Sequence, residues 1–153
     1  MKTISQSFCL GFSILLTCSV IAGAQTIYVG SGNNGQIIQY NSGGSGSFFA
    51  NLGLVTGMAY NGGNLYAASQ GSNDIVKYNS SGQGTVFASS GILVPNAIAF
   101  NTSGNLFLAN FKSNNILEFN SLGQSSVFAS GFQSLYNYTG LCTSQRQTEK
   151  RCF

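Results

Sequence analysis

The sequence predicts an all-β fold, an incomplete β-propeller of four-stranded antiparallel blades with about three repeats of roughly 40 residues. Two observations support this fold class. The stretch 64–104 holds four short runs rich in β-branched and aromatic residues, each closed by Gly, Ser or Asn. The same kinds of run begin again at Asn105, 41 residues after Asn64. Four strands in each period are what one propeller blade requires.

The repeats extend over most of the chain. The first copy aligns without a gap to the second at a distance of 38 residues, pairing Tyr28 with Tyr66 and Ile37 with Ile75, and it lacks an opening strand. The sequence therefore predicts a partial propeller over residues 25–142. Its blades are expected at 26–51, 56–89 and 96–130, with the start of a fourth near 138–142. The stretch 143–153 has no repeat character and is interpreted as a tail.

Glycine-rich segments separate the predicted strands, as tight hairpins require, because glycine readily adopts a positive φ. One of them, residues 30–35, also matches the G-x-G-x-x-G pattern of dinucleotide-binding loops. That function needs a following helix, whereas residues 36–40 read as a second strand. We therefore interpret residues 30–35 as a hairpin turn.

Residues 1–24 are predicted to be a secretory signal peptide. Lys2 supplies the positive start, an apolar stretch follows, and Ala22-Gly23-Ala24 forms a small-residue cleavage site. An uncut membrane anchor and a lipoprotein signal ending at Cys18 are the alternatives. The expected location is secreted, either extracellular or periplasmic.

The cysteine and histidine content limits the chemistry of the mature chain. Cleavage of the leader would leave only Cys142 and Cys152, which could form a disulfide in an oxidising compartment. The sequence contains no histidine. A Cys/His nucleophile, a Ser/His/Asp triad and a histidine-bound zinc are therefore excluded.

The low charge of the chain argues against a nucleic-acid partner. The lack of a long apolar segment after residue 24 argues against membrane insertion. Charged residues make up 6% of the chain, the net charge is +3, and the basic residues form no stripe across the repeats. After the leader no segment approaches the roughly 20 apolar residues of a spanning helix. We expect no nucleic acid and, after cleavage, no membrane among the partners.

The repeat resembles that of the NHL-repeat propellers and the related gluconolactonase-like six-bladed proteins. The resemblance rests on the strand, turn and strand order and on inner strands such as Gly57-Met58-Ala59 and Ala97-Ile98-Ala99. It implies a disc with a central pocket, used for binding partners or for metal-dependent chemistry on small molecules. Family members usually place an Asp after the inner strand, where this chain has Asn61 and Asn101.

The acidic residues do not repeat in a way that would build a metal site. Only Asp74 and Glu118 lie within the repeats, and they occupy different positions of equivalent strands. Hard cations need several oxygen ligands, including carboxylates. We therefore predict no catalytic, cofactor-binding or metal-binding residues, and no cofactor.

Some side chains recur or stand out. The aromatics at the positions of Tyr40 and Phe49 recur in each copy and are interpreted as packing between blades. Lys77 and Glu118 are expected on solvated faces. The loop Asn110-Phe111-Lys112 differs most from its counterpart in the preceding copy, so it is the predicted partner-contact loop.

The sequence thus predicts a secreted binding or interaction module, not an enzyme, with a protein or carbohydrate ligand. A gluconolactonase-like metal-dependent hydrolase is one alternative, and a truncated fragment of a longer propeller without independent function is another. Closed propellers need at least about four blades. A homodimer in which two half-rings complete one ring is therefore a further expectation.

Overall fold

The computed structural model describes residues 25–132 and 140–143. The predicted leader and nearly all of the predicted tail lie outside these residues. The described part contains eleven strands, one short 3-10 turn and no α-helix, which confirms the predicted all-β class. No helix in this part of the chain is long and apolar enough to span a membrane.

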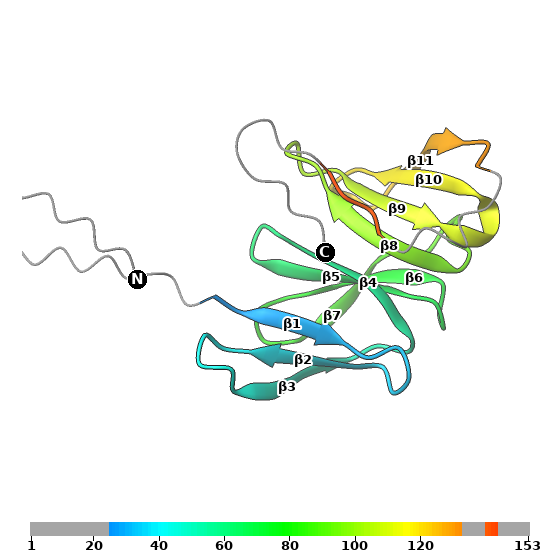
Figure 1. Cartoon of the computed structure of the whole chain (residues 1–153). Coiled ribbons are helices and arrows are strands. Elements are labelled where there is room, and N and C mark those ends of the chain that lie inside the picture. Colours follow the sequence, from blue (N-terminus) through cyan, green and yellow to red (C-terminus); the bar gives the residue numbers. More distant parts are fainter. Residues whose placement is uncertain (1–24, 133–139, 144–153) are drawn as a thin grey trace, which may run out of the picture.

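The strands form three antiparallel sheets, which Figure 1 shows side by side in chain order. The first sheet has three strands, in the order β1-β2-β3, and the other two have four, β4-β5-β6-β7 and β8-β9-β10-β11. The strands are β1 Ile27–Gly30, β2 Gln36–Tyr40, β3 Gly46–Asn51, β4 Val55–Asn61, β5 Asn64–Ser69, β6 Asp74–Tyr78, β7 Gly84–Ala88, β8 Pro95–Phe100, β9 Leu106–Asn110, β10 Asn115–Phe119 and β11 Ser125–Ser130.

The three sheets are structural copies of one another. The register between the two outermost strands shifts at the same repeat position in each sheet, at Ile37/Ile38, Ile75/Val76 and Ile116/Leu117. Such bulges increase the local twist of the strand pair. The sheets therefore twist alike and can stack as blades. Residues 30–35 connect β1 to β2, so the interpretation of the glycine pattern as a hairpin turn is confirmed.

A four-residue turn that the sequence analysis did not recognise recurs in the blades. It has the form Asn-x-x-Gly, and its asparagine Oδ1 accepts the backbone N–H groups two and four residues later at 2.9–3.0 Å. The glycine has a φ between +75° and +82°, a conformation that costs glycine little. The turns begin at Asn41, Asn79, Asn101 and Asn120.

Each pair of neighbouring sheets encloses its own hydrophobic core. The first and second sheets enclose a cluster that includes Ile37, Phe49 and Tyr78. The second and third enclose a larger one that includes Ile75, Leu108 and Phe119. The middle sheet is thus apolar on both faces, and the fold depends on packing between blades.

Aromatic rings lock the blades together at equivalent positions. Tyr66 of β5 packs edge-to-face on Phe87 of its own blade and on Phe100 of the next, with ring centroids 5.1 and 4.8 Å apart. Tyr28 packs edge-to-face on Phe49 of its own blade at 4.9 Å, and it stacks on Tyr60 of the next blade with ring centroids 6.0 Å apart. The aromatics that were predicted to pack between blades do so where a blade follows, since the ring centroids of Phe49 and Tyr78 lie 6.0 Å apart and those of Phe87 and Phe119 lie 6.3 Å apart.

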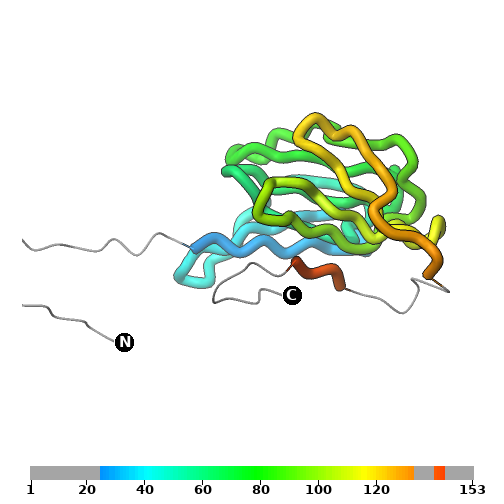
Figure 2. Tube along the Cα trace, turned by 90° about the horizontal axis from the view of Figure 1, so that it is seen from above, coloured from blue at the N-terminus to red at the C-terminus, as the bar shows by residue number. Residues whose placement is uncertain are grey.

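The innermost strands of adjacent blades approach closely. A Cβ atom built on Gly57 of β4 would lie 2.9 Å from Ala97 Cα of β8. Thr56 Oγ1 donates to Pro95 O across the same seam at 2.8 Å. Residues 140–143 lie beside β8 in turn, since Thr143 Oγ1 donates to Phe100 O. Figure 2 shows this segment (red) and β1 (blue) along the same edge of the stacked sheets.

The close approach predicts the effect of enlarging Gly57. The change Gly57→Ala would force β4 and β8 apart and should lower the free energy of unfolding by about 1–3 kcal/mol, the usual cost of overpacking. Denaturant unfolding measures this. Gly53→Ala is the matched control, because a Cβ there meets nothing within 4 Å, and its effect should stay within about 0.5 kcal/mol. Equal effects of the two changes would contradict the close seam.

Candidate functional site

Consecutive antiparallel strands place alternate connections at the same end of the stack. One end carries the loops 52–54, 70–73, 89–94 and 111–114, which we call the loop face. Backbone hydrogen bonds join its loops in pairs. Gln70 N donates to Leu54 O at 3.0 Å, and Lys112 N donates to Leu93 O at 3.2 Å.

The loop face holds unusual backbone conformations. All four non-glycine residues with positive φ in the described part of the chain lie here, at Leu54, Asn73, Val94 and Asn114, with φ between 44° and 56°. Asparagine tolerates this region, whereas a β-branched valine is a genuine outlier there. Leu54 immediately precedes β4 and Val94 immediately precedes β8, so the two residues stand at the same place in successive blades. The strain is therefore a repeated feature of the entry to the inner strand.

A buried amide holds the loop that leads into β8. Asn110 ends β9 and has no exposed surface. Its Oδ1 accepts Leu93 N at 2.7 Å, and its Nδ2 donates to Gly91 O at 2.9 Å. In the preceding blade Ser69, also fully buried, donates its hydroxyl to Gly53 O. The last residue of the second strand thus anchors the incoming loop in both blades.

The same loop is also held from the neighbouring blade. Asn73 Oδ1 accepts the N–H of the strained Val94 at 2.7 Å. Val94 O in turn accepts Phe111 N at 3.2 Å. Since both polar groups of the Val94 backbone have partners, the strained conformation is stabilised by its surroundings.

The structure separates the three residues of the predicted partner-contact loop. Asn110 is buried, and its side chain bonds to the backbone of loop 89–94 and is not exposed to solvent. Phe111 and Lys112 belong to the 3-10 turn η1 (Phe111–Ser113), which Asn114 closes by donating its N–H to Phe111 O at 3.1 Å. Phe111 is half-buried and Lys112 is exposed.

Two further side chains on the loop face were missed by the sequence analysis. Leu54 is 44% exposed and Leu93 is 48% exposed. The sequence does contain a signal for both residues, because each is an apolar residue in the loop that leads into an inner strand. The loop face therefore presents two apolar side chains and the ammonium group of Lys112 on a fixed backbone.

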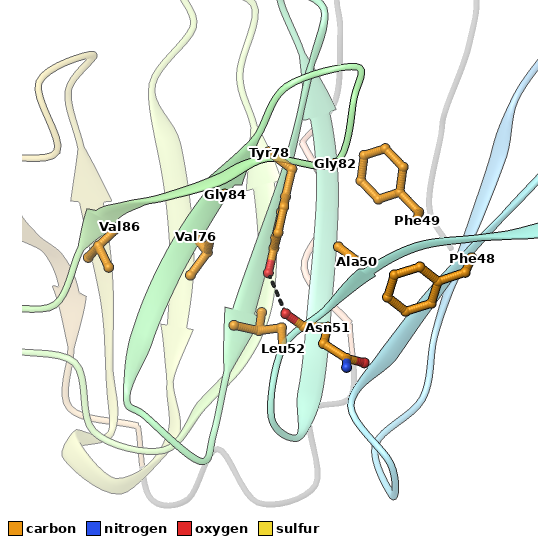
Figure 3. A pocket seen from close by; sticks show the side chains of 10 residues that line it. All are labelled: Phe48, Phe49, Ala50, Asn51, Leu52, Val76, Tyr78, Gly82, Gly84 and Val86. Atoms are coloured by element: carbon orange, nitrogen blue, oxygen red, sulfur yellow. Dashed lines mark hydrogen bonds between the residues drawn. The ribbon is translucent and has the colours of Figure 1, made fainter.

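A cleft lies at the rim between the first two blades (Figure 3). Tyr78 OH donates to Asn51 O across it at 3.1 Å. Burial, and secondarily the charge of Asp74, raises the pKa of the Tyr78 phenol. The lining contains no carboxylate, histidine or cysteine: it comprises Phe48, Phe49, Ala50, Asn51, Leu52, Val76, Tyr78, Gly82, Gly84 and Val86.

The acidic residues of the described chain already have side-chain partners. Asp74 Oδ1 accepts Ser72 Oγ at 2.6 Å, and Glu118 Oε1 accepts Asn105 Nδ2 at 2.7 Å. No three residues of the His, Cys, Asp and Glu types gather among the described positions. The residues that the structure describes therefore do not fit the oxygen-rich shell of a divalent cation.

The expectation that Lys77 and Glu118 lie on solvated faces is wrong. Both are half-buried. Lys77 Nζ lies 5.8 Å from the centroid of the Tyr66 ring, and Glu118 bonds to Asn105 as described above. Lys77 pairs directly with Tyr66 on the neighbouring strand β5, so its long side chain packs along that strand.

Of the two cysteines predicted to pair, Cys142 is disulfide-bonded. Cys152 lies outside the described residues, so the pairing itself stays a prediction.

No protein-family profile matches the sequence, and no curated protein matches it. Solved structures do. Virginiamycin B lyase from Staphylococcus aureus matches 76% of this chain with a TM-score of 0.63 and 13% identity. A chain of the nidogen/laminin complex matches 71% with a TM-score of 0.61 and 16% identity. A gluconolactonase from Xanthomonas campestris matches 71% with a TM-score of 0.57 and 21% identity.

These similar structures are propellers. They include two enzymes and a chain from a complex between two proteins. The chain spans 37–45% of their own lengths. Identities this low establish the fold alone. The predicted resemblance to propellers is thus confirmed at the level of the fold, and the described residues form part of a β-propeller.

Proposed function

We propose that this chain is an extracellular binding or interaction module and that the loop face contacts its partner. The observation that carries the proposal is the strained, non-glycine backbone at Leu54 and Val94. Strained residues persist only where their surroundings hold them, and they concentrate at binding and active sites. Here Asn73 and the buried Asn110 hold the loop of Val94, and the buried Ser69 holds the segment of Leu54. Two leucines and a lysine are exposed on the same face.

The chemistry of the loop face favours a protein partner. Exposed leucine side chains gain free energy when they are covered by another apolar surface. The neighbouring Lys112 can pair with a carboxylate of that partner. A sugar ligand would favour an open aromatic ring, whereas Phe111 is half-buried. A carbohydrate partner is therefore the second candidate.

A metal-dependent hydrolase is the alternative suggested by the gluconolactonase neighbour. Such an activity needs groups that polarise the substrate and move protons. The two described carboxylates lie on different blades and hold neighbouring side chains. Binding rather than hydrolysis is thus the function that these residues support. The extracellular location follows from the predicted leader at 1–24.

Site-specific photo-crosslinking tests the loop face. A crosslinking amino acid at position 112 should capture one discrete protein from the medium or tissue in which the chain occurs. The same amino acid at Thr102, an exposed turn residue at the opposite end of the blades, is the control and should capture little. Equal capture at both positions would count against the proposal. An oligosaccharide array, probed with the unmodified chain, tests the carbohydrate candidate.

The anchoring role of Asn110 predicts a loss of stability. Asn110→Ala leaves Leu93 N and Gly91 O without their buried partner, which should lower the free energy of unfolding by about 1–3 kcal/mol. Asn33→Ala, at an exposed asparagine of the β1–β2 turn, should change it by no more than about 0.5 kcal/mol. Chemical denaturation measures both. A neutral Asn110→Ala would show that the loop does not depend on this amide.

Cation binding distinguishes the hydrolase alternative. Titration of the purified chain with Ca²⁺ or Zn²⁺ in a calorimeter should give no saturable heat, and the melting temperature should not change, because a bound ligand would raise it. A sample treated with a chelator and then dialysed is the control. Saturable binding of one ion per chain, with hydrolysis of a sugar lactone that the ion restores, would favour the enzyme instead.

A further inference from the structure

We propose that two copies of the chain close one ring, with the open face of the first blade of each copy packed on the open face of the last blade of the other. The residues on these two faces are the repeat counterparts of residues that are buried between the blades. The inference does not rest on which partner the loop face binds.

The first blade exposes the side that its successors bury. Ile27 and Val29 of β1 are 55% and 51% exposed. Their counterparts in the second blade, Leu65 and Ala67, are 3% and 0% exposed because the first blade covers them. Ile27, Val29 and Tyr40 line a shallow groove on this open side. An apolar strand face of this kind is shaped to meet another blade.

The third blade exposes the opposite side. Phe49 of the first blade is 7% exposed, and Phe87 of the second is half-buried, each packed on the blade that follows. Their counterpart Phe128 is 60% exposed. Phe49 and Phe87 each pack on an aromatic ring of the next blade. The ring centroids of Phe49 and Tyr78 lie 6.0 Å apart, and those of Phe87 and Phe119 lie 6.3 Å apart. The residue at that repeat position in the first blade is Tyr40, so Phe128 of one copy should meet Tyr40 of the other.

The equivalent turn glycines of the three blades show independently that the first blade has no described blade against its open face. Cβ atoms built on Gly82 and Gly123 would lie 2.2 Å from Phe49 O and 2.1 Å from Phe87 O, so these turns sit directly on the preceding blade. Gly44 has the same turn and nearly the same φ, yet none of the residues that the structure describes lies within 4 Å of its Cβ position. In the proposed ring Phe128 O of the second copy occupies that place.

The innermost edge fits as well. Among the described strands none pairs with the free edge of β1, whereas β5 and β9 are paired there with β4 and β8. Residues 140–143 lie beside β8 on the side where a following inner strand belongs. Gly140-Leu141 aligns with Gly57-Met58 of β4. Met58 pairs with Ala67, the repeat counterpart of Val29, so Leu141 would lie opposite Val29 of the second copy. Backbone pairing would then satisfy an otherwise open strand edge.

Two copies are the number that the comparisons favour. The described chain corresponds to 44% of the length of virginiamycin B lyase and 42% of that of a streptogramin B lyase. Two half-rings related by a two-fold axis bury both kinds of end face at once and leave no free end. If the first blade of one copy packed on the last blade of another at an angle that did not close the ring, the copies would instead form an open-ended filament.

Light scattering on the chain secreted from its full coding sequence tests the ring. The expected mass is twice that of the monomer. Val29→Asp places a carboxylate in the proposed interface and should raise the dimer dissociation constant at least about tenfold, the effect of a buried unpaired charge. Val86→Asp is the matched control, a strand valine of the middle blade that is 63% exposed, and it should leave the dimer intact.

A second pair of variants guards against a folding defect. Gly44→Asn adds a Cβ that would collide with the second copy, while asparagine tolerates the positive φ. Gly62→Asn adds the same side chain at a positive φ in the β4–β5 hairpin, where there is also free space. Only Gly44→Asn should weaken the dimer. A wild-type monomer at concentrations up to about 100 μM, an open-ended oligomer, or equal effects of the paired variants would each overturn the proposal, and none would alter crosslinking at position 112.

Discussion

The fold depends on one constraint, which is that the middle blade is apolar on both faces. Ala67 and Ala68 are consecutive residues of β5, so they point to opposite sides of the sheet, and both are fully buried. A sheet of this kind is stabilised by a neighbour on each side, so the blades stabilise one another. The two hydrophobic clusters, the interlocked aromatic rings and the open end faces all follow from this requirement.

Close stacking of the blades also explains the loop face. Since the inner strands β4 and β8 approach to backbone contact at Gly57, the segments leading into them have little room to turn. Leu54 and Val94 take left-handed conformations there, and the buried side chains of Ser69 and Asn110 hold those segments. The feature that we interpret as a binding surface is thus a consequence of how tightly the blades pack, and its exposed leucines are carried on a rigid support.

Much of the fold could be predicted from the sequence, whereas most of the candidate site could not. The blade period and the hairpin reading of residues 30–35 depend on local alternation and on turn residues, which are visible along the chain. Lys77 was predicted wrongly because a polar residue in a strand indicates a wet face only if that face has no neighbouring blade. Glu118 is half-buried for a different reason, since it bonds to Asn105 just before β9. The sequence analysis assigned Asn110 to an accessible loop because its burial depends on tertiary contacts. Its partners Leu93 and Gly91 lie nearly 20 residues away in the sequence.

The sequence by itself determined the repeat, the strand content and the absence of histidine chemistry, because these depend on residue type and spacing. Only the tertiary structure decided which repeated residues differ in environment. Phe49 and Phe128 occupy the same position of the repeat, yet one is 7% exposed and the other 60%. No pattern within a blade distinguishes them. The difference comes from whether another blade follows, and packing between units that are distant in sequence is a property of the assembled fold alone.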